Sequence, residues 1–260
     1  MADITFNYKG NTIGEISASG THTLDTEGMY CEDDIKVVYV KPSGGSVDYF
    51  DLTWPTGALV TNDTALPQYF FNGRTGITKI TATNLTQIAS HYFRGCTSVE
   101  EIDCGTKPFG NPSQYVFRGD SSLKGFAYKY TGNSTTSIAI ETFYQCAALK
   151  YFDGAISAIS QTNVFNGCTV LETLVLRRTA GVTSLANTNS FDNTPFAANG
   201  TGGTLYVPNS LISSYQAASN WSTILGRANN SIKSIESTHT DPTAPIDLTL
   251  YYADGTLIPT

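Results

Sequence analysis

Phenylalanine recurs at a nearly constant spacing through the middle of the chain. Successive members are separated by 22, 24, 26 and 22 residues, and Phe191 follows 26 residues after the last of them. Self-similarity at a fixed period in this range is the signature of a repeat architecture. The five phenylalanines are Phe71, Phe93, Phe117, Phe143 and Phe165.

Two more apolar positions keep fixed offsets from these phenylalanines, six and nine residues further on. One coil cannot bury its apolar side alone, whereas stacked coils place like residues on like in continuous ladders. The pattern therefore predicts a β-rich α/β solenoid of about six coils, each with one strand and a short helical turn, and a parallel sheet along one face. The residues are Ile77, Val99, Leu123, Leu149 and Leu171 at offset six, and Ile80, Ile102, Phe126, Phe152 and Leu174 at offset nine.

Small residues follow each phenylalanine. Glycine stands two positions on in four of the five repeats, where it permits a tight backbone turn. Cysteine stands three positions on in three repeats, where we expect a small buried hydrophobic residue rather than a reactive thiol. The glycines are Gly73, Gly95, Gly119 and Gly167, with Gln145 in the remaining repeat, and the cysteines are Cys96, Cys146 and Cys168.

The segment Ile88–Ile102 resembles the BspA-type leucine-rich repeat, whose units read roughly I-x-x-x-A-F-x-G-C-x-x-L-x-x-I. Residues 203–222 are similar to the closing motif of such arrays. The resemblance implies repeats over residues 66–200, then a closing strand and a capping helix over residues 201–236. In that helix we expect Ser210 as the N-cap and an apolar face that covers the last coil, formed by Leu211, Tyr215, Ala218 and Trp221.

Both ends of the chain depart from the repeat. Residues 1–41 predict a small β module with a hairpin, and residues 42–65 a linker and the N-terminal cap of the solenoid. Residues 237–260 predict a stiff linker followed by a β-hairpin. The first segment also resembles a short β module of phage and prophage structural proteins, in Ile4–Ile16 and Gly28–Val37. This resemblance implies a virion context.

Composition narrows the range of partners. The net charge is −7, the pI is about 4.9 and there are only 15 Lys plus Arg, so no basic footprint indicates nucleic acid or an anionic membrane. No apolar stretch predicts membrane insertion, and the N-terminus does not resemble a signal peptide. Five cysteines without a C-x-x-C pair argue against a zinc site or a disulfide framework. We expect no metal and no cofactor.

Catalytic chemistry has little support in the sequence. A Cys/His pair of His91 and Cys96 is the arrangement worth weighing, but other repeats fill the cysteine position without any histidine. Glu101 and Asp103 lie on one face of a predicted strand, yet their spacing matches no metal-binding loop. We therefore expect a chain that is not an enzyme.

The outward positions of the predicted sheet are the candidate binding surface. Offsets eight and ten from each phenylalanine point away from the core. Tyrosines beside carboxylates can hold carbohydrate or a protein through ring contacts and hydrogen-bond acceptors. An ordinary polar sheet surface is the alternative. The candidates at these offsets are Lys79, Glu101, Asp103, Tyr151 and Asp153, to which the extension of the third coil's strand adds Tyr128 and Tyr130.

Three functional hypotheses follow. The first is a phage virion structural or adhesion protein, such as a tail, head-fibre or decoration component, which docks to other virion proteins through residues 1–41 and 237–260 and presents its repeats to host-surface carbohydrate or protein. Such a role predicts a homo-oligomer or a larger assembly. The second hypothesis is a bacterial cell-surface adhesin of the BspA type, and the third is an uncharacterised enzyme.

Overall fold

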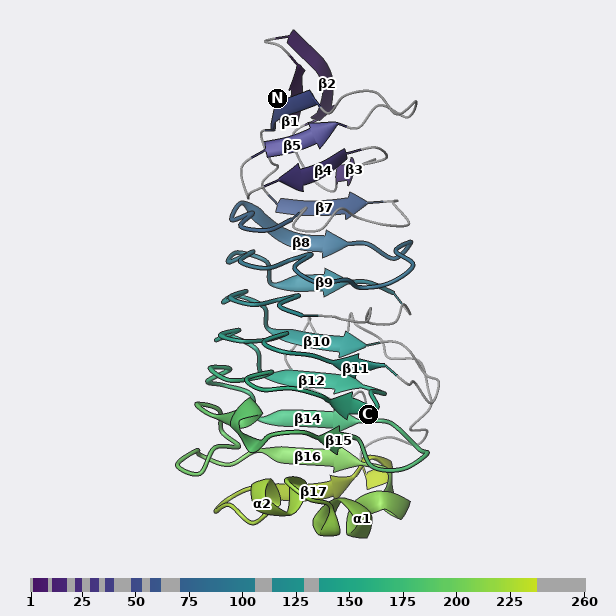
Figure 1. Ribbon diagram of the computed structural model, residues 1–260, viewed down its shortest axis with the longest axis vertical. Coiled ribbons are helices and arrows are strands. Elements are labelled where there is room, and N and C mark those ends of the chain that lie inside the picture. Colours follow the sequence, from purple (N-terminus) through teal and green to yellow (C-terminus); the bar gives the residue numbers. More distant parts are fainter. Residues whose placement is uncertain are drawn as a thin grey trace.

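The protein is represented by a computed structural model. It describes residues 71–105, 114–128 and 136–237, and, as backbone alone, seven strands between residues 2 and 61. Of the linker and cap predicted over residues 42–65, residues 42–47, 53–56 and 62–65 lie outside the described residues, as do residues 238–260 of the linker and hairpin predicted over residues 237–260. Figure 1 shows the described strands one below another in an elongated stack.

The repeats build two parallel sheets along one side of this stack, where the sequence predicted a single sheet. Neighbouring strands come from successive repeats, as expected when each repeat contributes one strand. The first sheet has the order β3 (His22–Leu24), β7 (Gly57–Thr61), β8 (Ile77–Thr81) and β9 (Glu101–Asp103). The second has the order β10 (Gly125–Tyr128), β12 (Tyr151–Gly154), β14 (Thr173–Leu176), β16 (Thr204–Val207) and β17 (Ser231–Ser234).

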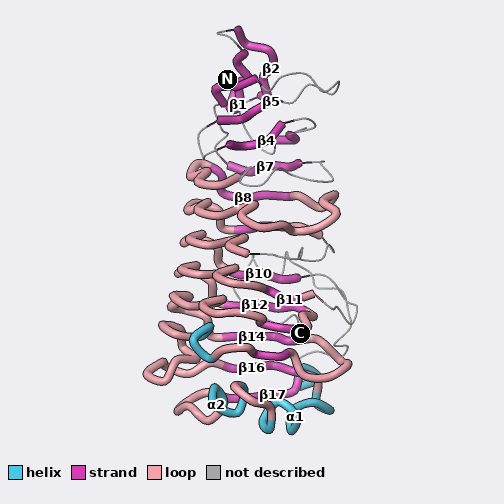
Figure 2. Tube along the Cα trace, in the orientation of Figure 1, coloured by secondary structure: helices cyan, strands magenta, loops and turns pink. Residues whose placement is uncertain are grey.

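Three very short strands form another parallel sheet beside the second one (Figure 2). They are β11 (Ser137–Ile138), β13 (Ala158–Ile159) and β15 (Ser184–Leu185). The helices lie at the C-terminal end, apart from the 3-10 helix η1 (Thr188–Phe191) in the last phenylalanine repeat. They are the 3-10 helix η2 (Asn209–Leu211), α1 (Ile212–Ala217), α2 (Trp221–Leu225) and the 3-10 helix η3 (Ile235–Ser237).

The repeating phenylalanines form a continuous column inside the stack. All five are fully buried, and their ring centroids lie 5.5, 5.5, 5.0 and 5.3 Å apart in order, with nearly parallel planes. Phe191 extends the column at 5.6 Å. These distances lie in the range of favourable offset stacking and match the spacing of neighbouring strands, about 4.8 Å. The column therefore fixes the register between successive repeats.

The apolar position nine residues after each phenylalanine forms a second column on the inner face of the sheets. Ile80 pairs with Ile102, and Phe126 pairs with Phe152, which pairs with Leu174. All are buried. Inward residues of neighbouring strands thus stand directly opposite one another, as the period of two along a strand requires.

The turn after each phenylalanine closes with a backbone hydrogen bond to the next repeat. The N–H groups of Gly73, Gly95 and Gly119 each donate over 2.8 Å to the carbonyl one position after the next phenylalanine. The four glycines at this position have φ between 69° and 83°, the left-handed region that glycine enters without a Cβ penalty. Gln145 adopts φ 60° at the same position and accepts the strain.

The cysteines after these turns pack in the apolar core and also donate hydrogen bonds there. Each Sγ donates a hydrogen bond to the carbonyl oxygen of the phenylalanine in the preceding repeat, over 2.8 to 3.0 Å. All three side chains are fully buried. The pairs are Cys96 with Phe71, Cys146 with Phe117, and Cys168 with Phe143.

The cap differs from the single helix that the sequence predicted. Ser210 lies inside η2 rather than at an N-cap, and the helix ends at Ala217 because Ala218 is extended (ψ 138°). Asn220, with φ 65°, then starts a separate helix, α2. The two large aromatic residues expected on the covering face, Tyr215 and Trp221, are nevertheless fully buried.

The strands before residue 62 form a five-stranded antiparallel sheet of their own and two strands, β3 and β7, of the first parallel sheet. The residues expected to be a linker contribute β6 to it, so this sheet extends past the predicted boundary at residue 41, and β3 joins β7 instead. The order is β2 (Asn11–Ser17), β1 (Ala2–Tyr8), β6 (Asp48–Leu52), β5 (Lys36–Tyr39) and β4 (Met29–Glu32).

Candidate binding surfaces

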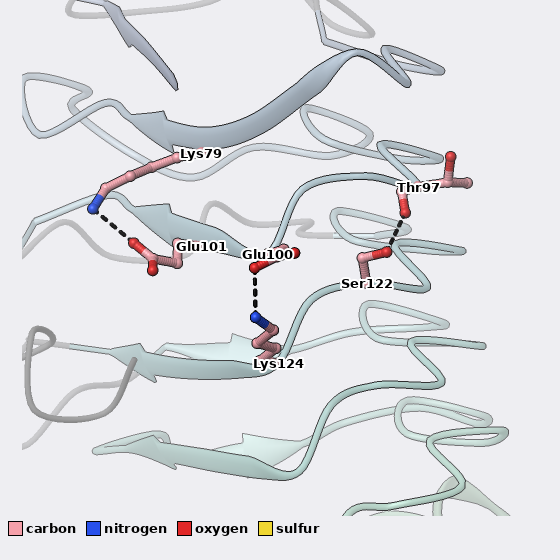
Figure 3. Close-up of polar contacts among 6 residues, drawn as sticks. All are labelled: Lys79, Thr97, Glu100, Glu101, Ser122 and Lys124. Carbon is pink, nitrogen blue, oxygen red and sulfur yellow. Dashed lines mark hydrogen bonds and ion pairs between the residues drawn. The ribbon is translucent and has the colours of Figure 1, made fainter. Parts of the chain in front are cut away.

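The outer face of β8 and β9 carries charged residues that are open to solvent. Lys79 Nζ lies 2.6 Å from Glu101 Oε2, and the two side chains are 51% and 27% exposed. Asp103 Oδ1 accepts a hydrogen bond from Gly105 N–H over 2.8 Å, so this carboxylate also orders the turn after β9. Figure 3 shows the Lys79–Glu101 pair crossing from one repeat to the next.

A second row of charges lies seven residues after four of the five phenylalanines, the exception being Phe71. Glu100 pairs with Lys124 of the next repeat, and Lys150 pairs with Glu172 over 3.7 Å (Figure 3 shows the first pair). These side chains are about half exposed, so each pair contributes on the order of 0.2–1 kcal/mol. Within these two pairs, opposite charges on successive repeats favour the observed register more than they add stability.

The outer face of β10, β12 and β14 is buried, unlike the exposed surface that the alternation predicted. Tyr151 is 1% exposed and Asp153 is 0% exposed. The Tyr151 ring lies across Gly125 of the neighbouring strand, since a Cβ on that glycine would stand 2.0 Å from Tyr151 Cζ. Glycine thus leaves room for the ring to lie flat on the sheet.

Asp153 is buried with a cation. Arg177 Nε and Nη2 donate to its two carboxylate oxygens over 2.5 and 2.7 Å, a bidentate pair on the outer face of the second sheet. A fully buried carboxylate that is already paired is a poor contact for a partner in solution. Tyr130 and the side chain of Tyr128 lie outside the described residues.

A third surface, which the sequence analysis did not single out, lies at the turn before and after each buried phenylalanine. Positions two before and one after the phenylalanine carry partly exposed side chains in successive repeats. The signal in the sequence was the recurrence of aromatic and basic residues at these two offsets. We call this set the corner cluster: His91, Arg94, Tyr115, Arg118, Glu141 and Tyr144.

The members of the corner cluster contact one another between repeats. The rings of His91 and Tyr115 lie with centroids 4.9 Å apart. The Arg118 guanidinium lies 5.7 Å from the Tyr115 ring centroid and 5.4 Å from that of Tyr144. Its Nε lies 2.9 Å from Glu141 Oε2. Arg118 is therefore held by two rings and a carboxylate.

His91 and Cys96 do not form a catalytic pair in this geometry. The Cys96 thiol is fully buried and donates to a backbone carbonyl. Burial raises the pKa of Cys96 well above its ordinary value, with a further contribution from Asp120. Burial also lowers the pKa of His91, and the charges of Arg94 and Arg118 add to that effect. A protonated, buried thiol is not a nucleophile.

The described ranges 71–105, 114–128 and 136–237 hold no group of three or more His, Cys, Asp or Glu side chains that could bind a metal ion. In the same ranges, no helix has the length and apolar character needed to cross a membrane. Four cysteines in these ranges are free and buried: Cys96, Cys104, Cys146 and Cys168.

Comparison with known protein families finds a match to the repeat region of the chain. Residues 59–172 match the BspA type leucine rich repeat region in six copies. A leucine-rich repeat protein from Bacteroides ovatus, known as a crystal structure, is similar over 89% of this chain and 66% of that one, just under two thirds of its length, with 10% identity and a TM-score of 0.34. No curated protein matches the sequence. Residues 59–172 thus match the BspA-type leucine-rich repeat, which confirms for this part of the chain the resemblance seen in its repeats.

Proposed function

We propose that this chain is a non-enzymatic binding protein, in which a solenoid of about six leucine-rich repeats presents the outer face of β8 and β9 to a partner on a cell surface. The observation that carries the proposal is the match of residues 59–172 to the BspA-type repeat, a kind of repeat typical of cell-surface proteins. A surface or protein-binding role is the function that this match supports. The specific partner and setting belong to the proposal.

The charged face of β8 and β9 is suited to bind a partner, because its own ion pair can be replaced by contacts to that partner. Lys79 and Glu101 are partly exposed and paired with each other, so a partner can replace this ion pair without uncovering a buried charge. Asp103 next to them is only partly buried. Such a rim of mixed charge favours specificity and rapid association more than raw affinity.

We place this binding protein in a phage particle, as a tail, head-fibre or decoration component. The resemblance of residues 4–37 to β modules of phage structural proteins supports this setting, and residues 1–41 and 237–260 would be the docking segments. A bacterial cell-surface adhesin is the second candidate, and the repeat match favours it. Both settings use the same repeat surface.

Quantitative mass spectrometry of purified phage particles and of bacterial envelope fractions from the source distinguishes the two settings. A fixed number of copies per particle supports the virion role. Enrichment in the envelope fraction contradicts it and supports the adhesin. Absence of the chain from both fractions contradicts both settings.

A charge-reversed variant tests the binding face itself. Lys79→Glu combined with Glu101→Lys keeps the ion pair but inverts the charge pattern that a partner meets. We expect the labelled full-length variant to bind cells at least about tenfold more weakly than the unmodified chain, with unchanged thermal unfolding. The matched control reverses the pair Lys150–Glu172 and should bind normally. Equal binding by all three chains would exclude β8 and β9 as the contact.

A further inference from the structure

The corner cluster departs from the backbone preference of its position. His91, Tyr115 and Glu141 lie two residues before their phenylalanines and have φ of 61°, 57° and 53°. The equivalent residue of the next repeat is Asn163, with φ 59°. Asparagine and glycine enter this left-handed region most readily, whereas bulky residues are strained there. The backbone therefore does not account for histidine, tyrosine and glutamate at this position.

Core packing does not account for these side chains either. Every member of the corner cluster is partly exposed, whereas the phenylalanines beside them are fully buried. Local rules of this kind are most often broken where a surface has a function. The feature that remains is a row of three rings, with the Arg118 guanidinium between those of Tyr115 and Tyr144, spread over three successive repeats.

The charges of the cluster do not balance. Arg118 is neutralised by Glu141. Arg94 makes no ion pair with any residue of the described ranges, yet it lies close enough to His91 to affect that ring electrostatically. The cluster thus carries an excess positive charge on a chain whose net charge is −7. Such a local reversal of sign attracts anions to one place.

We propose that the corner cluster binds a carbohydrate that bears a carboxylate. Arg94 takes the carboxylate through the two parallel N–H donors of its guanidinium. The His91, Tyr115 and Tyr144 rings supply amphipathic faces for the sugar. The arrangement favours a sugar over an acidic peptide, because the His91 and Tyr115 rings are tilted and only 4.9 Å apart and, with Tyr144, offer a row of partly exposed rings along the turns, which suits the faces of sugar rings.

This site deepens the proposed binding role but does not use β8 or β9. Its success or failure therefore leaves the test of Lys79 and Glu101 untouched. If the charge-reversed chain loses cell binding while the corner cluster binds no sugar, only the inference about the corner cluster is wrong. The reverse outcome overturns only the role of the sheet face.

The experiment is an isothermal calorimetric titration of the full chain with trigalacturonic acid. The fully methyl-esterified form of the same sugar serves as the neutral ligand. We expect binding of the acid and at least about tenfold weaker binding of the ester, since loss of a charge-assisted bidentate contact costs this much or more. Arg94→Gln should weaken binding of the acid to the level of the ester. Arg94→Lys should give an intermediate affinity, because a lysine keeps the charge but not the fork.

Lys233→Gln is the matched control, since it removes an exposed cation from the terminal strand β17 and should leave the affinity unchanged. His91 gives an independent readout by NMR. The nearby arginine charges contribute to its lowered pKa, so a bound carboxylate should raise that pKa in the unmodified chain but not in Arg94→Gln. His91→Gln identifies the signal among the three histidines.

Three outcomes overturn the inference. One is that no binding of trigalacturonic acid is detected at millimolar concentration. Another is that Arg94→Gln and Lys233→Gln bind as the unmodified chain does. The third is that a triglutamate peptide competes as well as the sugar, which would show that the cluster responds to negative charge alone.

Discussion

At the scale of single residues, the position three after each phenylalanine holds side chains of different chemical types in equivalent surroundings. Cysteine fills it in three repeats and donates to a carbonyl of the preceding repeat. Asp120 fills it in the repeat of Phe117, fully buried, and its Oδ1 accepts from Cys96 N–H over 2.8 Å. Its other oxygen, Oδ2, has no hydrogen-bond partner. A neutral carboxylic acid suits this site better than a carboxylate.

Stability should therefore fall as the pH rises from the ordinary pKa of an aspartic acid toward the raised pKa of Asp120 in the folded chain. Burial raises the pKa of Asp120 well above its ordinary value, Cys146 adds to the rise, and backbone N–H groups of Cys96 and Gly95 oppose it. Above the unfolded pKa of about 4, the folded chain holds a proton that the unfolded chain has released, so each pH unit costs up to about 1.4 kcal/mol until the folded pKa is reached.

Urea unfolding at pH 4.5, 6 and 7.5 measures this effect, with Asp120→Asn as the reference, because asparagine keeps the acceptor for Cys96 without a titrating proton. We expect the stability of the unmodified chain to fall relative to that of Asp120→Asn as the pH rises. Parallel pH curves for the two proteins would show that Asp120 is ionised throughout.

Individual residues also show which parts of the fold the sequence could predict. The spacing of Phe71, Phe93 and the later phenylalanines is enough to place the buried column, because only stacked repeats can bury such a residue at that period. The alternation of inward and outward residues along a strand wrongly predicted that Tyr151 and Asp153 are exposed, because the exposure of an outward residue also depends on its neighbours. Tyr151 is buried because it lies over Gly125 of the neighbouring strand, and Asp153 because it pairs with Arg177 of the next repeat. Neither contact can be predicted from the sequence pattern.

At the scale of elements, the cap satisfies the backbone beside the last strand of the small sheet. Tyr215 Oη accepts from Thr183 N–H over 2.9 Å, and Trp221 Nε1 donates to Thr183 O over 2.6 Å. Asn220 Nδ2 donates to the carbonyls of Leu185 and Ala186, at and just after β15. An edge left with free donors and acceptors is a site for unwanted pairing, and these contacts cover it.

The amphipathic pattern of the cap predicted which aromatic residues are buried but not the break between α1 and α2. Leu211, Tyr215 and Trp221 would share a face of one helix. The break lies at the extended Ala218 and at Asn220, which has φ 65° and whose side chain donates to two carbonyls at and just after β15. Tertiary hydrogen bonding thus overrides the local pattern.

Tyr215→Phe should lower the free energy of unfolding by about 1–3 kcal/mol, because the buried Thr183 N–H loses its acceptor. Tyr206→Phe is the matched control, since Tyr206 lies on the partly exposed side of β16 and should change stability by less than about 0.5 kcal/mol. Chemical denaturation measures both. Equal effects of the two substitutions would contradict the capping role of the Tyr215 hydroxyl.

At the scale of the whole molecule, most contacts join neighbouring repeats. The strands of the parallel sheets pair with those of the repeats before and after, and the corner turns, cysteines and ion pairs also connect neighbouring repeats. In such a stack stability is close to a sum of repeats and of the interfaces between neighbours. A local defect should then weaken its own repeat and those next to it, rather than the molecule as one unit.

Phe143→Ala tests this expectation in the middle of the stack. Its ring is fully buried between Phe117 and Phe165, with centroids 5.0 and 5.3 Å away, and truncation should lower the free energy of unfolding by about 3–5 kcal/mol. Hydrogen exchange should show protection lost first in the repeats that contain Phe117, Phe143 and Phe165, with the cap at residues 201–236 retained longer. Val170→Ala removes an exposed side chain as the control and should leave protection unchanged. A uniform loss of protection across the described ranges would instead show that the repeats unfold as one cooperative unit, with coupling that extends beyond neighbouring interfaces.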